Sequence, residues 1–249
     1  MHEFVLAMVH TISMSDFWNT KLTDAFWIGF DTETTGIDPK HDQLVSASLI
    51  TRGTPAQSDI RYWLADPGVE IPASAQSVHG ISTEQARRDG LPLPLVLEQI
   101  AAAITTGWQR GGVLVAFNLP FDLGLLECNL VRCGMPTLSQ RMGGGFGPVV
   151  DPLVIDRYLV KKRPGPRKLA NLCTAYGLGA YGFHDARDDV NATLDLLERM
   201  VASQPTLGDA TLGELARGQQ QWHAQWAEGF NAFLASKGRT PDVSTSWPL

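Results

Sequence analysis

The stretch that decides the fold is Phe30-Asp31-Thr32-Glu33-Thr34-Thr35-Gly36. The apolar run of residues 25–30 leads into it, and the short, aromatic and β-branched composition of that run is typical of a buried strand. Side chains alternate between the two faces of a strand, so Asp31 and Glu33 point to the same side. Two neighbouring buried carboxylates are costly unless a cation neutralises them. The pattern therefore predicts a site for a hard divalent metal such as Mg²⁺ or Mn²⁺.

Two further acids lie where a metal site of this kind needs them. Asp122 follows the apolar run of residues 113–117 and belongs to the first turn of a predicted helix. Asp189 begins the predicted helix of residues 188–201, five residues after His184. Ligand sites in open α/β sheets form where strands end, so the four carboxylates are expected to meet at one edge of a sheet. For an isolated Asp-x-Glu pair, the alternative is a strand end whose acids simply reach water.

Composition and charge limit the class of protein. The chain of 249 residues is long enough for one sizeable core, and its formal net charge is −6. Proteins that wrap duplex nucleic acid usually carry a basic excess, so any nucleic-acid contact is expected to be local, with bound metal supplying positive charge. The only dense basic run covers residues 161–168, and it is either a solvated loop or a contact to a phosphate backbone.

The sequence also carries signals about location. It has no apolar run of the ~18–20 residues that a membrane span requires. The first residues include His2, Glu3 and His10 in place of a basic segment, so no secretory signal is predicted. Three sparse cysteines suit a reducing compartment. We therefore expect a cytoplasmic protein without contact to a membrane.

Hydrophobic periodicity predicts an α/β protein with a mixed five-stranded sheet flanked by helices. Three strands separated by short polar turns form an antiparallel meander, and the two later strands run parallel. The predicted strands are residues 25–30 with Asp31 and Glu33 at their end, 44–50, 60–64, 113–117 and 149–151. Helices are predicted from Ser82 as N-cap with Gln85 closing a capping box, and over residues 95–105, 121–131, 154–160, 169–176 and 188–201. Residues 72–80 and 141–148 are expected to be loops.

The C-terminal part has a helical pattern of its own. Trp222, Trp226, Phe230 and Phe233 follow one another at spacings of four and three. So aromatic a segment either packs back onto the domain, which we favour, or docks on a partner. The expected organisation is a lead-in over residues 1–22, a compact domain over 23–204 and a helical extension over 205–249.

Three motifs together carry a family resemblance. They are residues 30–36, Asn118-Leu119-Pro120-Phe121-Asp122, and His184-Asp185-Ala186-Arg187-Asp188-Asp189-Val190-Asn191-Ala192-Thr193. They resemble the three exonuclease motifs of the DnaQ-like, or DEDDh, 3′→5′ exonucleases, a family that includes the proofreading epsilon subunit of bacterial DNA polymerase III. Val78-His79-Gly80-Ile81 resembles a further segment of this family. The resemblance covers residues 25–200, and three motifs in this order are far more specific than any one of them.

The resemblance implies a ribonuclease H-like fold, with which the predicted strand order agrees. It also implies that Asp31, Glu33, Asp122 and Asp189 hold two divalent ions, Mg²⁺ or Mn²⁺. Two such ions can clamp the attacking and leaving oxygens of a phosphoryl displacement. His184 is then the general base, because a histidine with a pKa near ~6.5 can accept a proton from water at neutral pH.

Substrate contacts follow from the same resemblance. Thr34, Thr35 and Gly36 are expected to offer backbone N–H groups to the terminal nucleotide. His79 is expected beside the 3′-terminal sugar, and Asn118 is grouped with these substrate-binding residues.

The leading hypothesis is a metal-dependent 3′→5′ exonuclease that releases nucleoside 5′-monophosphates from single-stranded or frayed 3′ ends, with DNA favoured over RNA. An exoribonuclease that trims RNA is one alternative. Another is a non-catalytic adaptor that the aromatic tail recruits to a polymerase or a repair assembly. An endonuclease of the wider ribonuclease H-like fold is a third, and it would cut circular strands.

Overall fold

A mixed sheet lies at the centre of the computed structural model, which describes residues 17–53, 59–179, 181–182 and 185–249. Its first three strands are antiparallel neighbours, as the meander predicted. They are β1 (Phe26–Thr34), β2 (Leu44–Arg52) and β3 (Ile60–Asp66). The register pairs Asp31 of β1 with Ser48 of β2, and Ser48 with Tyr62 of β3, so these three residues form one row across the sheet.

The parallel part of the sheet lies on the other side of β1. There β5 (Gly112–Val115) pairs with β1, and β6 (Val149–Val150) pairs with β5. A further strand, β4 (Leu91–Pro92), runs parallel to β3, which gives the order β4-β3-β2-β1-β5-β6. The predicted α/β class and strand directions are confirmed, but the predicted number of five strands is wrong. The sixth, β4, has only two residues, too few to produce an alternating pattern.

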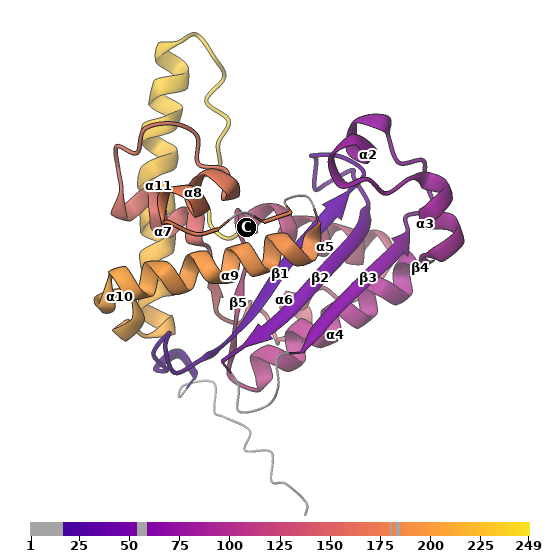
Figure 1. The fold of residues 1–249 in the computed structure, drawn as a ribbon, viewed down its shortest axis with the longest axis horizontal. Coiled ribbons are helices and arrows are strands. Elements are labelled where there is room, and N and C mark those ends of the chain that lie inside the picture. Colours follow the sequence, from indigo (N-terminus) through magenta and orange to yellow (C-terminus); the bar gives the residue numbers. More distant parts are fainter. Residues whose placement is uncertain (1–16, 54–58, 180, 183–184) are drawn as a thin grey trace, which may run out of the picture.

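Helices cover both faces of the sheet (Figure 1). The long helix α9 packs on β1 and β2, whereas α4 contacts β5 and β3 from the opposite face. The helices of the described residues are α2 (Ala73–His79), α3 (Thr83–Asp89), α4 (Leu93–Gln109), α5 (Leu119–Arg132), α6 (Leu138–Arg141), α7 (Pro152–Leu159), α8 (Leu169–Ala175), α9 (Ala186–Ser203), α10 (Pro205–Asp209) and α11 (Leu212–Ser236). In the part of the chain that the structure describes, no helix combines the length and apolar character needed to cross a membrane.

The segment of residues 72–80 corrects the sequence prediction, because most of it is helix α2 and not a loop. Pro72 precedes its first turn and Gly80 ends it in the left-handed conformation, with φ 76°. None of its residues is buried, so the helix has no apolar stripe that a periodicity analysis could detect. Ser82 is the N-cap of α3, as predicted, and its side chain accepts a hydrogen bond from the backbone N–H of Gln85.

The C-terminal helix α11 packs against α7 and β6. Trp222 stacks on Tyr158 of α7 with ring centroids 4.1 Å apart, so the aromatic segment does pack back at this point. The fully buried amide of Gln219 accepts a hydrogen bond from the N–H of Asp151 and donates one to the carbonyl oxygen of Val149. The helix is therefore bonded to the last strand of the sheet.

The basic run of residues 161–168 is only in part a solvated loop. The Asp156 carboxylate of α7 is fully buried, and it accepts hydrogen bonds from Arg163 and Arg167. The Tyr176 hydroxyl donates a further hydrogen bond to the same carboxylate, at 3.0 Å. Two of the cations thus neutralise an internal acid, whereas Lys161, Lys162 and Lys168 are exposed.

Candidate active site

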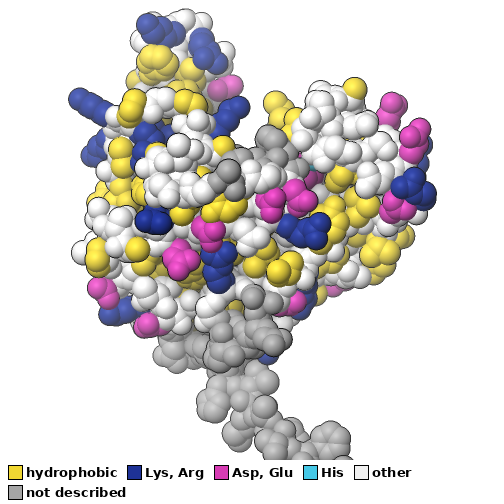
Figure 2. Space-filling model, viewed as in Figure 1, with side chains coloured by type: hydrophobic (Ala, Val, Ile, Leu, Met, Phe, Trp, Pro, Cys, Tyr) yellow, Lys and Arg dark blue, Asp and Glu magenta, His cyan; other side chains and the backbone are white. Residues whose placement is uncertain are grey.

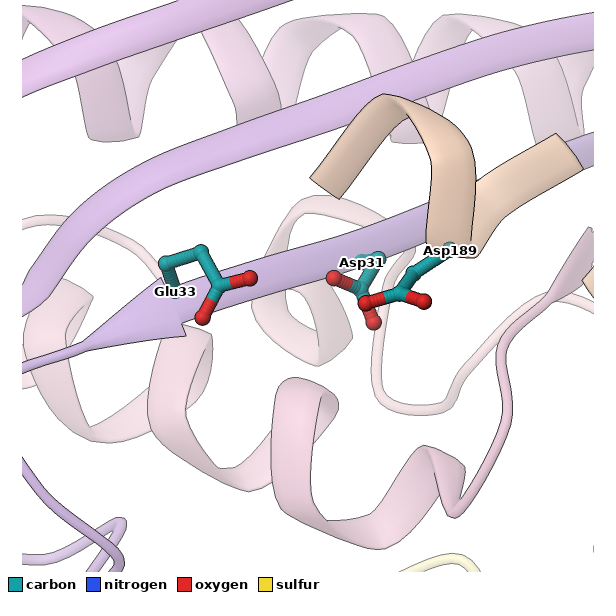
Figure 3. Close-up of side chains that lie close together, drawn as sticks. All are labelled: Asp31, Glu33 and Asp189. Carbon is teal, nitrogen blue, oxygen red and sulfur yellow. The ribbon is translucent and has the colours of Figure 1, made fainter. Parts of the chain in front are cut away.

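Three carboxylates converge beside the sheet. Oxygen atoms of Asp31 and Glu33 on β1 and of Asp189 on α9 all lie within 4.8 Å of one another. Figure 3 shows the three side chains pointing into the same space, two from the strand and one from the helix. The alternation of side chains along β1 places Asp31 and Glu33 on one side of the strand, as the sequence predicted, and α9 packs on β1 beside them.

A glycine allows α9 to approach β1 so closely. A Cβ atom on Gly29 would lie 2.6 Å from a methyl carbon of Val190 and 2.8 Å from one of Leu194. Val190 follows Asp189, so this contact brings the metal-ligand candidate of α9 down onto the strand. The N-cap of α9 is Asp185, whose carboxylate accepts a hydrogen bond from the N–H of Arg187 at 2.9 Å. Gly29 lies outside the three motifs, and Asp185 lies within the third one, where it was given no role of its own.

The electrostatics of this cluster are those of negative charges held together. Burial and the charges of Asp122, Asp189 and Glu33 raise the pKa of Asp31 well above its ordinary value. Burial and the charges of Asp189, Asp122 and Asp185 raise the pKa of Glu33 to about 8. Each carboxylate therefore disfavours ionisation of its neighbours unless positive charge is added.

Asp122, the fourth predicted ligand, lies next to this group but is directed to Thr32. Its carboxylate accepts hydrogen bonds from the Thr32 backbone N–H at 3.1 Å and from the Thr32 hydroxyl at 2.6 Å. Burial raises its pKa to about 7, and the bonds from Thr32 oppose that shift. The structure thus gathers three of the four acids into one cluster and holds the fourth beside them on the first turn of α5.

The turn that leads into α5 is fixed by a buried acid. Asn118 is the only residue other than glycine with a positive φ in the described chain, at 61°. The Asp151 carboxylate accepts hydrogen bonds at 3.1 Å from the N–H groups of both Asn118 and Leu119. A third bond comes from the N–H of Leu153 at 2.8 Å. Asp151 therefore holds the turn from which Asp122 projects. This role depends on contacts between distant parts of the chain, so no sequence motif indicates it.

The loop after β1 differs from the expectation for the substrate contacts. The N–H of Thr35 donates to the carbonyl oxygen of Gln43, so that group is not available to a nucleotide. The Thr35 hydroxyl donates to the Asp42 carboxylate at 2.9 Å. A Cβ atom on Gly36 would lie 2.5 Å from the same carboxylate, so glycine is needed there for the approach of Asp42. The Thr34 hydroxyl bonds to the Gly36 carbonyl oxygen and closes the turn.

His79 lies at the border of the acidic cluster. It ends α2, and a small cavity of about 230 Å³ is lined by His79 together with Glu33, Ser46, Tyr62 and neighbouring residues. The Ile81 N–H donates to its Nδ1 at 3.1 Å, and burial lowers the pKa of the imidazole. A neutral ring at the edge of the cavity is therefore positioned near Glu33. His184 lies outside the described residues, so its predicted role stays a prediction.

The donor set fits a hard divalent cation. It consists of carboxylate oxygens alone, which suit Mg²⁺ and Mn²⁺, and the mutual repulsion described above needs a cation for relief. Among the described residues, no lysine or arginine forms an ion pair with Asp31 or Glu33. The cluster is thus built as a cation site.

Comparison with known proteins identifies the family. The model of the RNase_T exonuclease family matches residues 28–197, a range that begins within β1, ends within α9 and includes every acid of the cluster. The chain belongs to this exonuclease family, and the DnaQ-like resemblance expected from the three motifs is confirmed.

Sequence relatives include replicative polymerases. The chain is 32% identical over 183 residues to DNA polymerase III PolC-type of Streptococcus thermophilus, and 29% identical over 178 residues to the PolC-type enzyme of Lactococcus lactis. The first match covers 72% of this chain and 11% of the polymerase, and the second covers 70% and 10%. The chain therefore spans about a tenth of these relatives.

Solved structures of exonuclease I share the fold. One, whose study addresses how processivity is achieved, superposes with a TM-score of 0.65 at 20% identity, covering 74% of this chain and 42% of that one. Exonuclease I of Methylocaldum szegediense gives a TM-score of 0.62 at 22% identity, with the same coverage. E. coli exonuclease I in complex with a dA16 oligonucleotide also gives 0.62, at 20% identity. The ribonuclease H-like fold is thereby confirmed.

Proposed function

We propose that this protein is a metal-dependent 3′→5′ exonuclease of the DEDDh type that removes nucleoside 5′-monophosphates from single-stranded or frayed 3′ ends, with DNA favoured. The observation that carries the proposal is the cluster of Asp31, Glu33 and Asp189 within 4.8 Å, in a chain of the exonuclease family. The similar proteins support a nucleic-acid substrate, because they include DNA polymerases and an exonuclease bound to an oligonucleotide.

In this proposal the carboxylates of Asp31, Glu33, Asp122 and Asp189 hold two divalent ions, Mg²⁺ or Mn²⁺. Those ions supply the positive charge that an in-line phosphoryl displacement needs at the attacking and leaving oxygens. Thr32 keeps the Asp122 carboxylate close to the cluster through two hydrogen bonds. Asp151 holds the turn that aims the first residues of α5, including Asp122, toward β1.

His184 is proposed as the general base that accepts the proton of the attacking water. In the sequence it precedes Asp185, the N-cap of α9, by one residue and Asp189 by five. The substrate's terminal nucleotide is proposed to lie against the Thr34–Gly36 turn, His79 and Asn118. The cavity of about 230 Å³ that His79 and Glu33 line supports this placement.

The test is nucleotide release from 5′-labelled strands in the presence of Mn²⁺ or Mg²⁺. Wild-type protein is expected to shorten a linear single strand one nucleotide at a time from its 3′ end, and Asp189→Ala is expected to leave it intact. A circular single strand should survive, and its cleavage would support the endonuclease alternative. Unchanged background release in wild type and Asp31→Ala would favour the non-catalytic adaptor.

RNA trimming remains a second candidate for the same chemistry. The acidic cluster acts on phosphodiester bonds and does not discriminate between sugars. Matched DNA and RNA strands of one sequence therefore belong in the same assay, and faster loss of the RNA would overturn the DNA preference. We further propose residues 23–204 as the exonuclease domain, after the lead-in of residues 1–22, and residues 205–249 as a helical extension that could recruit a polymerase or a repair partner.

A further inference from the structure

One side of α11 carries an aromatic stripe that the proposed chemistry does not use. It consists of Trp222, Trp226, Phe230 and Phe233 with Lys237 one turn further on. Trp226 and Phe230 stack with ring centroids 5.3 Å apart and an interplanar angle of 12°. Phe230 and Phe233 follow at 6.1 Å and 26°. The rings of Trp226, Phe230 and Phe233 thus form a stacked ladder along the helix, and Trp222 lies one turn before it.

The ladder changes from core to surface along its length. Trp222 is covered by Tyr158 of α7, whereas Phe230 is 37% exposed and Phe233 is 51% exposed. Figure 1 shows this end of α11 projecting beyond the rest of the molecule. Two large aromatic side chains on a projecting helix end are not explained by packing within the described chain.

Cations accompany the rings. The guanidinium carbon of Arg157 lies 3.4 Å from the centroid of the Trp226 ring, and the Lys237 ammonium lies 5.9 Å from that of Phe233. Residues 157–176 and 229–241 contain no acid, whereas Glu228 lies between Trp226 and Phe230, and Asp242 follows the second range. The exposed Lys161 and Lys162 follow α7, which packs on α11. We call the part of the molecule formed by α7, α8, α11 and the segment between α7 and α8 the basic lobe. Figure 2 shows Lys and Arg side chains gathered over it, although the whole chain carries a net charge of −6.

This basic lobe flanks the candidate active site. Helix α8, at the end of the basic segment, packs on α9, which supplies Asp189. The molecule is hollowed between this lobe and the lobe of α2 and α3 (Figure 2). Residues 66–92 of the second lobe hold four acids and two arginines, so they are net acidic. A polyanion that leaves the site is therefore attracted to the side of α11.

We propose that the α11 ladder is a binding surface for single-stranded nucleic acid, taking the part of the substrate strand that lies upstream of its 3′ end. Bases of any sequence stack on exposed aromatic rings, and interleaved cations contact the backbone, which is the general design of single-strand binding grooves. Binding along a duplex needs many contacts between cations and phosphates, and this surface has too few cations for that. The proposal rests on the proposed function, since it concerns the same strand.

The experiment measures binding of fluorescein-labelled dT20 by anisotropy in chelator, where no hydrolysis occurs. Phe230→Ala combined with Phe233→Ala is expected to weaken the affinity for dT20 by about fivefold or more per ring. Phe230→Tyr with Phe233→Tyr keeps two stacking rings and should restore the affinity to within about twofold. The matched control, Gln221→Ala with Gln225→Ala, changes two exposed residues of the same helix outside the stripe and should bind like wild type.

Turnover separates this surface from the catalytic site. Release from a trinucleotide should be unchanged in the double alanine variant, whereas KM for dT20 should rise at constant kcat. If the double alanine variant binds dT20 with wild-type affinity, or if the double tyrosine variant loses as much affinity as the alanine variant, the proposed binding surface is wrong. Ring-dependent self-association in sedimentation without loss of dT20 binding would assign the ladder to protein contacts. If wild type releases nothing from either strand, the proposed function fails, while the anisotropy still decides on the ladder.

Discussion

Buried carboxylates occur in two contrasting settings in this molecule. Asp156 is fully buried and is met by two arginines and a tyrosine hydroxyl. Asp31 and Glu33 on β1 are surrounded by other carboxylates, and burial together with those charges raises their pKa values. Both settings hold negative charge away from water, but only the first supplies its counter-charge from the same chain.

The difference separates a structural acid from a functional one. Removing one member of a buried ion pair destabilises the fold strongly, because the remaining charge is left uncompensated away from water. A cluster of like charges lowers the stability of the fold and persists where its cost is offset by a ligand. Mutations at Asp156 and Asp31 should therefore have different effects on stability and on activity, and measuring both tests the contrast.

The largest effect is expected for Asp31→Asn. Nucleotide release should fall on the order of 10³-fold, equivalent to about 4 kcal/mol of lost transition-state stabilisation, because the cation site loses a ligand. In chelator the same variant should melt at or above the wild-type temperature, since one repelling charge has gone. Release assays and thermal melts of one preparation check both. A variant that is inactive and also less stable without metal would place Asp31 in the structural class.

Asp156→Asn should show the opposite combination. The Arg163 and Arg167 side chains are only 13% and 20% exposed, so they lose a charged partner in a poorly solvated place. We expect a loss of about 3 kcal/mol in the free energy of unfolding. For a chain of this size that loss lowers the melting temperature by about 6–12 °C. Nucleotide release per folded molecule, measured well below the transition, should stay close to wild type.

Metal addition sharpens the same comparison. Mg²⁺ or Mn²⁺ at a hundred times its dissociation constant should stabilise the wild type by about 2.7 kcal/mol, because the ion binds only the folded cluster. Asp31→Asn should gain far less, and Asp156→Asn should gain as much as wild type. The measurement is the melting temperature across a titration of each ion. Equal stabilisation of all three proteins would place the ions elsewhere.

The smallest effect concerns a buried group that is kept neutral. Burial lowers the pKa of His223, whose Nε2–H donates to the Ser244 carbonyl oxygen at 3.0 Å. Its Nδ1 atom is buried and has no partner among the described residues, so a second proton there would be unsatisfied. The unfolded chain therefore binds the proton first, and this group lowers stability as the pH falls through its ordinary value of 6.5.

His223→Gln keeps the donor and removes the titration. Its free energy of unfolding should decline less than that of wild type between pH 7.5 and pH 5, by at most about 1.4 kcal/mol per pH unit. The acidic cluster titrates in both proteins, so its contribution cancels in the difference. Parallel curves for the two proteins would exclude His223 from the pH dependence.

Much of the fold was predictable from local patterns. The β1 run and the stripe of α9 are long enough for a pattern to emerge, and β5 stands out as a continuous apolar run; all three elements are present. The elements that were missed are short or lack a buried face, as β4 and α2 do. Such segments take their structure from caps and from neighbouring strands, which a single sequence does not display.

The site was predictable in its residues more than in its geometry. The alternation in β1 was sufficient to place Asp31 and Glu33 on one face. The orientation of Asp122 depends on Thr32, and the engaged N–H of Thr35 depends on Gln43, a residue on the far side of a turn. These hydrogen bonds join segments that are brought together only when the chain folds, so they cannot be predicted from the spacing of residues in the sequence.

The amide of Gln219 has a consequence for the boundary of the sheet. By bonding to the N–H of Asp151 and the carbonyl of Val149, it takes the place that a neighbouring strand would occupy beside β6. An open strand edge is a template on which other chains can add and aggregate. A chain cut before α11 would expose that template, so the helix protects the protein from self-templated assembly through one side chain.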